Sequence, residues 1–308
     1  LSSSDTSEGT VSPASLTFTS ANWNVAQTVT VTGVDDDIDD DNVPYTIVPA
    51  PPSSADLIYV GLNPADVSAT NTDDTDAAGI IVTPTSGLVT TESGGTATFT
   101  VALTSQPTAN VTTGLSSGDV AEGTVSPASL AFTGTNWAVP QIATVTSQND
   151  AIPDGDVLYT IGTSPATSAD SKYNGMNPAD VSVTNVDDET AGFTVSPSSG
   201  PTTEAGGQAT FTIVPNNQPG ADVIVGLSSS DVTEGTISIA SLTFTTANWS
   251  TPQTVTVPGV NDNVDDGDVV YTIVTAPATS ADPSYSGINA ANVSVANVDD
   301  DVAGFAVS

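Results

Sequence analysis

The amino-acid sequence predicts an all-β protein made of tandem antiparallel β-sandwiches of about seven strands each. Three observations support this fold class: apolar and polar residues alternate over short stretches, Thr and Val dominate these stretches, and Gly, Pro, Asn and Asp cluster between them. Alternation with a period of two turns one face of a strand toward a core. β-Branched residues suit a pleated, half-buried surface, whereas Gly, Pro, Asn and Asp suit turns.

Individual strands can be placed from this alternation. In the segment 96–103, Phe99, Val101 and Leu103 share one face, and polar or small residues lie between them. The same criteria predict seven strands in the central part of the chain, near 79–84, 96–103, 109–115, 123–133, 140–147, 156–163 and 180–186. Seven short antiparallel strands in about 110 residues are typical of a two-sheet, immunoglobulin-like sandwich.

One unit of sequence recurs along the chain. The segments around Trp23, Trp137 and Trp249 are closely similar, and these tryptophans are 114 and 112 residues apart. A unit of this length is one ordinary domain that can bury its own core, not a short solenoid repeat. We interpret each tryptophan as a plug at one end of a sandwich, the alternative being a platform on which a sugar ring stacks.

The repeat predicts four segments. We expect a partial repeat over 1–76, complete repeats over 77–189 and 190–301, and the first strand of a further repeat over 302–308. We call the first three segments the first, second and third repeats. An alternative for 302–308 is that this strand completes a neighbouring chain by strand addition. We favour an excerpt of a longer array, because exposed edge strands are normally avoided.

The charge balance excludes several partners. The chain of 308 residues contains 36 Asp and Glu, no His and a single basic side chain, Lys172, which gives a formal net charge of −35. Nucleic acids and anionic membrane surfaces need clustered Lys and Arg, so neither is an expected partner. No apolar run is long enough to span a membrane. No Cys is present, so disulfides and thiolate metal sites are excluded.

The acids gather at four places in each repeat: after the first strand, after the third, before the sixth and after the seventh. Because consecutive strands of such a sandwich run antiparallel, these four places meet at one pole, next to the following repeat. Asp is also common in turns and keeps an acidic protein soluble, but that does not explain why the opposite pole has few acids. Asp56, Asp170 and Asp282 are the exception at that far pole, as turn residues or contacts to the preceding linker.

Crowded carboxylates repel one another unless a cation lies between them. Ca²⁺ accepts 6–8 oxygen ligands in flexible geometry, and carboxylates and turn carbonyls can supply them. Mg²⁺ requires stricter octahedral geometry. The sequence therefore predicts Ca²⁺ sites at the acidic pole, with Mg²⁺ as the second choice.

Four segments together resemble the Calx-β domain. They are Glu92 followed by GGTATFTV, then LTFT…PQTVTV, then DGD…YTI, and finally VTNVDD at the end of the repeat. The resemblance covers both complete repeats and the partial one. It implies an immunoglobulin-like sandwich that binds several Ca²⁺ ions at one pole.

The resemblance also implies the ligands. In the second repeat they are Glu92, Asp119, Asp150, Asp154, Asp156, Asp187 and Asp188. In the third repeat they are Glu204, Asp231, Asp262, Asp266, Asp268, Asp299, Asp300 and Asp301. The first repeat departs from the pattern because Asn42 stands at the position of Asp156. Its remaining candidates are Asp36, Asp40, Asp73 and Asp74.

We expect a structural or adhesive role for the chain. Without His, Cys or Arg, the usual nucleophilic and phosphoryl-transfer sites cannot be built, so we expect no enzyme activity. The main hypothesis is a stalk or filament segment of a bacterial cell surface, made rigid by Ca²⁺ between neighbouring repeats. The alternatives are a binding module for a glycan or another surface, and a subunit of a self-assembling extracellular filament.

Overall fold

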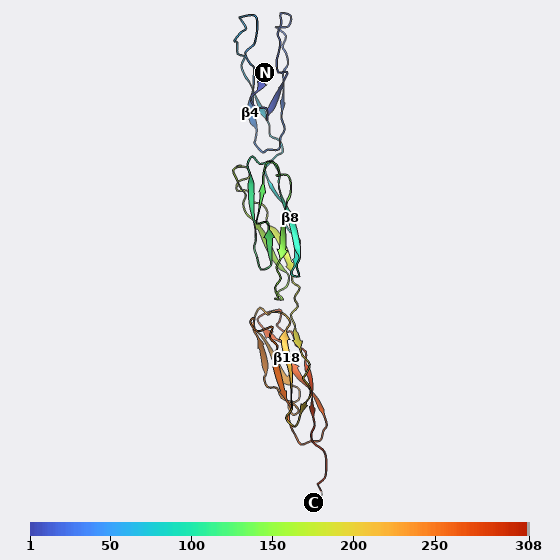
Figure 1. Cartoon of the computed structure of the whole chain (residues 1–308). Helices are drawn as coiled ribbons and strands as arrows, with labels where there is room; N and C mark the ends of the chain where they lie inside the picture. The colour runs from blue at the N-terminus through green and yellow to red at the C-terminus, as the bar shows by residue number, and fades with distance from the viewer. Residues whose placement is uncertain (307–308) are drawn as a thin grey trace.

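The computed structural model of the chain describes residues 1–306, and this part consists of β-strands and loops without a helix. Figure 1 shows three units stacked end to end in an elongated rod, with the N-terminal unit at one end and the C-terminus at the other. No helix in the described part of the chain could cross a membrane.

The second repeat is a two-sheet sandwich. Its strands are β6 (Ile80–Thr83), β7 (Leu88–Thr91), β8 (Thr96–Leu103), β9 (Val111–Ser117), β10 (Gly123–Ser126), β11 (Ser129–Phe132), β12 (Gln141–Ser147), β13 (Val157–Thr163), β14 (Thr167–Ser168) and β15 (Val181–Val186). One sheet has the order β10-β12-β8-β6. The other has the order β11-β9-β13-β15-β7, and β14 pairs with β9.

The third repeat follows the same plan. Its strands are β16 (Phe193–Val195), β17 (Thr202–Thr203), β18 (Gln208–Pro215), β19 (Val223–Ser229), β20 (Ser241–Phe244), β21 (Gln253–Pro258), β22 (Val269–Thr275), β23 (Thr279–Ser280) and β24 (Val293–Val298). The sheets have the orders β16-β18-β21 and β17-β24-β22-β19-β20, and β23 pairs with β19.

The first repeat has fewer strands. They are β1 (Ser2–Ser3), β2 (Gly9–Ser12), β3 (Thr30–Gly33), β4 (Val43–Val48) and β5 (Val67–Asn71). They form a sheet of order β1-β4-β5 and a two-stranded sheet of β2 and β3. All four residues of β3 are exposed. Its counterparts β12 and β21 pair with β8 and β18, and the first repeat has no such strand among the described residues.

Each complete repeat has its own core. In the second repeat, Phe99 and Val145 of one sheet pack with Phe132 and Val183 of the other, and all four are at most 1 % exposed. Burial of one such side chain stabilises a fold by about 1.5–3 kcal/mol. An equivalent cluster forms in the third repeat. The predicted all-β sandwich fold is therefore confirmed.

The structure corrects two details of the strand prediction. The strand expected over 123–133 is two strands in different sheets, β10 and β11. Pro127 between them has no N–H to donate to a ladder, but the third repeat makes the same crossing with Ile239 at this position. The short strand β7 was not predicted. It pairs parallel to β15, so this sandwich is not purely antiparallel.

The segment 302–308 does not form the predicted strand over its described part, 302–306. Its counterparts β6 and β16 pair only with β8 and β18, and no described strand offers that partner. Val302 and Phe305 are accordingly fully or almost fully exposed. Residues 307–308 lie outside the described part of the chain.

A tyrosine and a glycine that recur in all three repeats lie in contact with each other. Tyr159 in β13 is buried, and its ring lies directly over Gly123, where a Cβ would collide with the tyrosine hydroxyl. Gly9 under Tyr45 and Gly235 under Tyr271 repeat this contact. The tryptophans are less buried than expected: Trp137 packs half-buried against the core, whereas Trp23 is 67 % exposed.

Candidate metal centres at the acidic poles

The four acidic loops of the second repeat meet at one end of the sandwich. Glu92, which follows β7, donates its backbone N–H to Val186 O at the end of β15, at 3.0 Å. Gly155, before β13, donates its N–H to Asp187 Oδ2 at 2.7 Å. Gln148, after β12, donates its N–H to Glu122 O at 2.9 Å. The backbone thus holds loops distant in sequence against one another.

One group of carboxylates surrounds the glutamate that follows the β7-type strand. Glu92, Asp187 and Glu189 each offer an oxygen within 4.8 Å of the others, and Glu204, Asp299 and Asp301 do the same in the third repeat. We call these two groups the inner clusters. Glu92 is only 3 % exposed and Glu204 only 4 %.

Buried oxygens of the inner clusters lack hydrogen-bond partners. They are Glu92 Oε2, Glu189 Oε2, Glu204 Oε2 and Asp301 Oδ2. Buried polar atoms in folded proteins nearly always have a partner, and a buried carboxylate without one is costly. A cation placed among these oxygens would satisfy them, and the same arrangement occurs in both complete repeats.

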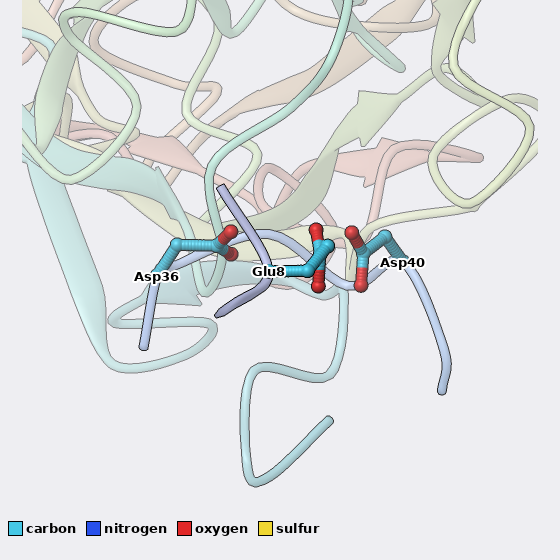
Figure 2. Close-up of side chains that lie close together, drawn as sticks. All are labelled: Glu8, Asp36 and Asp40. Carbon is cyan, nitrogen blue, oxygen red and sulfur yellow. The ribbon is translucent and has the colours of Figure 1, made fainter. Parts of the chain in front are cut away.

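A second group of acids gathers around a glutamate that precedes the glycine under the buried tyrosine. Glu8, Asp36 and Asp40 form it in the first repeat; Figure 2 shows Glu8 between the two aspartates, whose carboxylates turn toward it. Glu234, Asp262 and Asp266 form it in the third repeat. We call these groups the outer clusters. Glu8 and Glu234 are 7 % and 5 % exposed.

The outer group is looser in the second repeat. Glu122 is buried like Glu8 and Glu234, at 6 % exposure. Burial raises its pKa, and the charges of Asp154, Asp119 and Asp150 act in the same direction, although a hydrogen bond from Asn185 lowers it. The three aspartates are thus near Glu122, but their oxygens are not gathered within the same 4.8 Å.

The first repeat has a further acidic group in place of an inner cluster. Asp35, Asp74 and Asp76 offer oxygens within 4.8 Å of one another. They line a depression of about 250 Å³, together with the outer cluster of that repeat. Burial raises the pKa of Asp76 to about 6, and its contact with Asp74 acts in the same direction.

A buried asparagine joins the two groups of the second repeat. Asn185 in β15 is fully buried, and its amide nitrogen lies 3.4 Å from Glu92 Oε1 and 3.2 Å from Glu122 Oε2. Thr90 fixes the orientation of this amide by donating its hydroxyl to Asn185 Oδ1 at 2.9 Å. Asn297 makes the corresponding bonds with Glu234 and Thr202. The amide therefore holds the glutamates in place from behind.

Several of the predicted ligands belong to these clusters. They are Glu92, Asp187, Glu204, Asp299, Asp301, Asp262, Asp266, Asp36, Asp40 and Asp74. Asp150 and Asp154 lie close enough to Glu122 to raise its pKa.

The other predicted ligands lie outside the clusters. Asp119 and Asp231 each accept a backbone N–H of their own loop at 3.0 Å. Asp156 and Asp268 each accept the N–H of the aspartate that follows the last strand, at 3.3 Å. Asp188 and Asp300 are exposed and alternate with the inward-facing acids on either side. Asp73 donates its N–H to Asn42 Oδ1 at 3.1 Å.

The sequence prediction omitted six acids that the structure places in or beside the clusters. They are Glu8, Glu122, Glu234, Glu189, Asp35 and Asp76. A signal existed for the first three, because the dipeptide Glu-Gly recurs at the same position of all three repeats. For Glu189, the signal is the spacing of two residues from Asp187.

Asp170 and Asp282, at the pole opposite the acidic clusters, each hold two loops of their repeat together. Asp170 Oδ2 accepts the N–H of Thr108 at 2.8 Å, and Asp282 Oδ2 accepts the N–H of Gly220 at 2.8 Å. Each bond joins two loops of the same repeat. Both aspartates are therefore turn residues, and Asp282 also lines a depression with Pro153 and Asp154 of the preceding repeat.

Crowding shifts the protonation of the inner clusters. Burial raises the pKa of Glu92 to about 8, and its contact with Glu189 and the charge of Asp150 act in the same direction. Burial also raises the pKa of Glu204, with the charges of Asp262 and Asp299 adding to the effect. The inner clusters offer acceptor oxygens alone, and their carboxyl groups are costly to ionise without a counter-charge. Such a site suits a hard cation.

The acidic poles of the first and second repeats contact the repeat that follows. Between the first and second repeats, Gln106 donates its N–H to Asp37 O at 2.7 Å. Between the second and third repeats, Gln218 donates its N–H to Ala151 O at 2.7 Å. Asp37 lies in the loop of Asp36 and Asp40, and Ala151 lies in the loop of Asp150 and Asp154. A cation bound there would also act on the joint between repeats.

Comparisons with known proteins give only distant likenesses. No family model matches the chain, and no curated protein matches it. Among solved structures, CBD12 from CALX1.2 is 14 % identical, covering 66 % of this chain and 82 % of that one, with a TM-score of 0.30. Surface layer protein SbsC, domains 4–9, is 15 % identical, covering 97 % of this chain and 38 % of that one, with a TM-score of 0.24. Likenesses this distant carry no argument about function, and the fold class rests on the sheets described above.

Proposed function

We propose that the chain is a structural segment of an extracellular repeat array, in which Ca²⁺ bound at each acidic pole fixes the angle between consecutive repeats. One observation carries the proposal: glutamate oxygens that are buried and unpartnered at the pole through which each complete repeat meets the following segment. The rod in Figure 1 has the shape that a stalk or spacer requires.

The ligand chemistry favours Ca²⁺ over other cations. The inner clusters offer carboxylate oxygens from two loops, and the carbonyl of Gln148 accepts from Asn185, whose amide also contacts Glu92. Ca²⁺ takes such mixed oxygen ligands at 2.3–2.6 Å without a strict geometry. No Cys or His is present to attract softer metals. Extracellular modules of this kind bind Ca²⁺ with Kd of about 10⁻⁴–10⁻³ M.

The proposed role is structural because the chain has few groups that catalyse reactions. It contains no His, Cys or Arg, and crowded acids lie where one repeat meets the next. An oxygen-rich pole beside the cross-repeat hydrogen bonds of Gln106 and Gln218 suits a joint. Its stiffness would then follow the Ca²⁺ concentration outside the cell.

Small-angle X-ray scattering of the whole chain tests this proposal. We expect a rigid, elongated particle in millimolar Ca²⁺ and a flexible one in chelator, because the uncompensated carboxylates at each joint repel one another. The double variant E92Q/E204Q is the matched control, and Ca²⁺ should stiffen it less than the wild type. Identical scattering of the wild type with and without chelator would reject the proposal.

A further inference from the structure

The joint between the first and second repeats contains an ion pair. Lys172, the only basic side chain of the protein, lies in the loop between β14 and β15 of the second repeat. Its Nζ lies 2.6 Å from Asp39 Oδ1 and 2.9 Å from Asp41 Oδ1, and both aspartates belong to the first repeat. The side chains of Lys172 and Asp39 are only 32 % and 18 % exposed.

Both sides of this pair depart from the repeat pattern. Asp41 occupies the position of Gly155 and Gly267, and like them it has a positive φ, of 65°. It is the only non-glycine residue with a positive φ in the described part of the chain. This conformation disfavours a side chain, so aspartate is not the residue that the local backbone prefers.

Lys172 departs in the same way on the other side of the joint. The third repeat has Ser284 at that position, and its hydroxyl donates to Pro153 O of the second repeat at 2.5 Å. Pro153 in turn stands where the first repeat has Asp39. Three substitutions on two repeats thus meet at one point and replace a neutral hydrogen bond with an ion pair.

We propose that Lys172, Asp39 and Asp41 form a metal-independent clasp, which holds the joint between the first and second repeats at cation concentrations where the next joint loosens. The ammonium group lies against a loop, 35–41, in which six of seven residues are aspartates. The attraction between this ammonium group and the carboxylates offsets part of the repulsion among them, as a bound cation would. Hydrogen bonds to the two aspartates also raise the pKa of Lys172, so the clasp stays charged at physiological pH.

The joint between the second and third repeats has no such clasp. Its cross-repeat contacts among the described residues are hydrogen bonds, such as those of Ser284 and Gln218, and no ion pair crosses it. The dependence of this joint on a bound cation rests on the function proposed above, whereas the clasp does not. The clasp predicts that the two joints of the chain differ in stiffness.

Distance measurements by electron paramagnetic resonance can test the clasp in the whole chain. The protein has no Cys, so pairs of spin labels can be placed on introduced cysteines alone. Ser68 and Thr160 are exposed strand residues on either side of the clasped joint, and Thr160 and Ser294 are exposed on either side of the next joint. The width of each distance distribution reports the mobility of one joint.

In metal-free protein at low salt, we expect a narrower distribution at the clasped joint than at the next one. Lys172→Ser should broaden only the clasped joint, with about a two- to fivefold larger population of bent states, the effect of one partly exposed ion pair. Lys172→Arg should keep it narrow, and about 1 M NaCl should act like Lys172→Ser because salt screens the pair.

An unchanged distribution at the clasped joint in metal-free Lys172→Ser would overturn the clasp. This outcome is distinct from failure of the calcium proposal, in which the joint between the second and third repeats would show the same width with Ca²⁺ and without it. Asp41→Gly, which restores the glycine of the other repeats, should reproduce part of the Lys172→Ser effect.

Discussion

Glu92→Gln is expected to stabilise the protein in chelator and to destabilise it in Ca²⁺. Without a cation, Glu92 is a buried acid with an unpartnered oxygen among other acids, and it either keeps a proton that it would release in the unfolded chain or ionises at a cost. A neutral amide of the same shape avoids both costs and can donate to Asp187 or Glu189. An unsatisfied buried polar group costs about 1–3 kcal/mol, so we expect the thermal midpoint of the metal-free repeat to rise by several degrees.

With Ca²⁺ the same substitution removes a charged ligand. A site with about a tenfold excess of Ca²⁺ over its Kd stabilises the folded state by about 1.4 kcal/mol, and we expect the wild type to melt at a clearly higher temperature in Ca²⁺ than in chelator. Glu92→Gln should lose most of this gain in the second repeat, and Glu204→Gln should do so in the third.

Calorimetric melting of the wild type and the variants, each in Ca²⁺ and in chelator, checks this reversal. Asp188→Asn is the matched control: it removes one negative charge at the same pole, but Asp188 is exposed and outside the cluster. Its effect should be small in both conditions. An effect of Glu92→Gln with the same sign in both conditions would show that the cluster is not a cation site.

The stability of the metal-free protein is expected to fall as pH rises from about 4.5 to 8. The pKa of Glu92 is raised from its ordinary value of 4.5 to about 8, so across this window the folded state binds a proton that the unfolded state has released. The resulting stabilisation is fully present below the unfolded pKa and is lost as pH rises through the folded pKa. The raised pKa values of Glu204 and Glu234 act in the same direction.

Denaturant unfolding at pH 5, 6.5 and 8, on protein freed of divalent cations, measures this dependence. Glu92→Gln should reduce this dependence but not abolish it, because Glu92 no longer titrates while Glu204 and Glu234 still do. Ca²⁺ should weaken or reverse it, because the cation binds deprotonated carboxylates. A metal-free protein that becomes more stable between pH 5 and pH 8 would contradict the crowding of the inner clusters.

Much of the fold could be predicted because each long strand carries its own alternating pattern. β8 and β13 have such a pattern, and the structure places them as expected. β7 was missed because four residues, paired parallel to a distant strand, carry too little periodicity. The split between β10 and β11 was missed because the apolar residues Val125, Leu130 and Phe132 indicate one continuous strand, whereas the chain crosses to the other sheet at Pro127.

The acidic pole was predictable, but its individual ligands were only partly so. Which acids of a loop turn inward depends on packing: Tyr159 lies over Gly123, and the neighbouring Glu122 is buried beside Asn185 while Asp119 of the same loop stays exposed. Packing likewise turns Glu189 inward and leaves Asp188 exposed. These orientations depend on contacts between distant strands, which the sequence of one loop does not specify.

The claim that the poles bind Ca²⁺ is tested most directly by isothermal titration calorimetry of the whole metal-free chain. We predict saturable binding of more than one Ca²⁺ per chain, with Kd of about 10⁻³ M or tighter, weaker binding of Mg²⁺, and fewer sites in E92Q/E204Q. The absence of saturable binding at millimolar Ca²⁺ would contradict the account and leave the acids as a solvated surface.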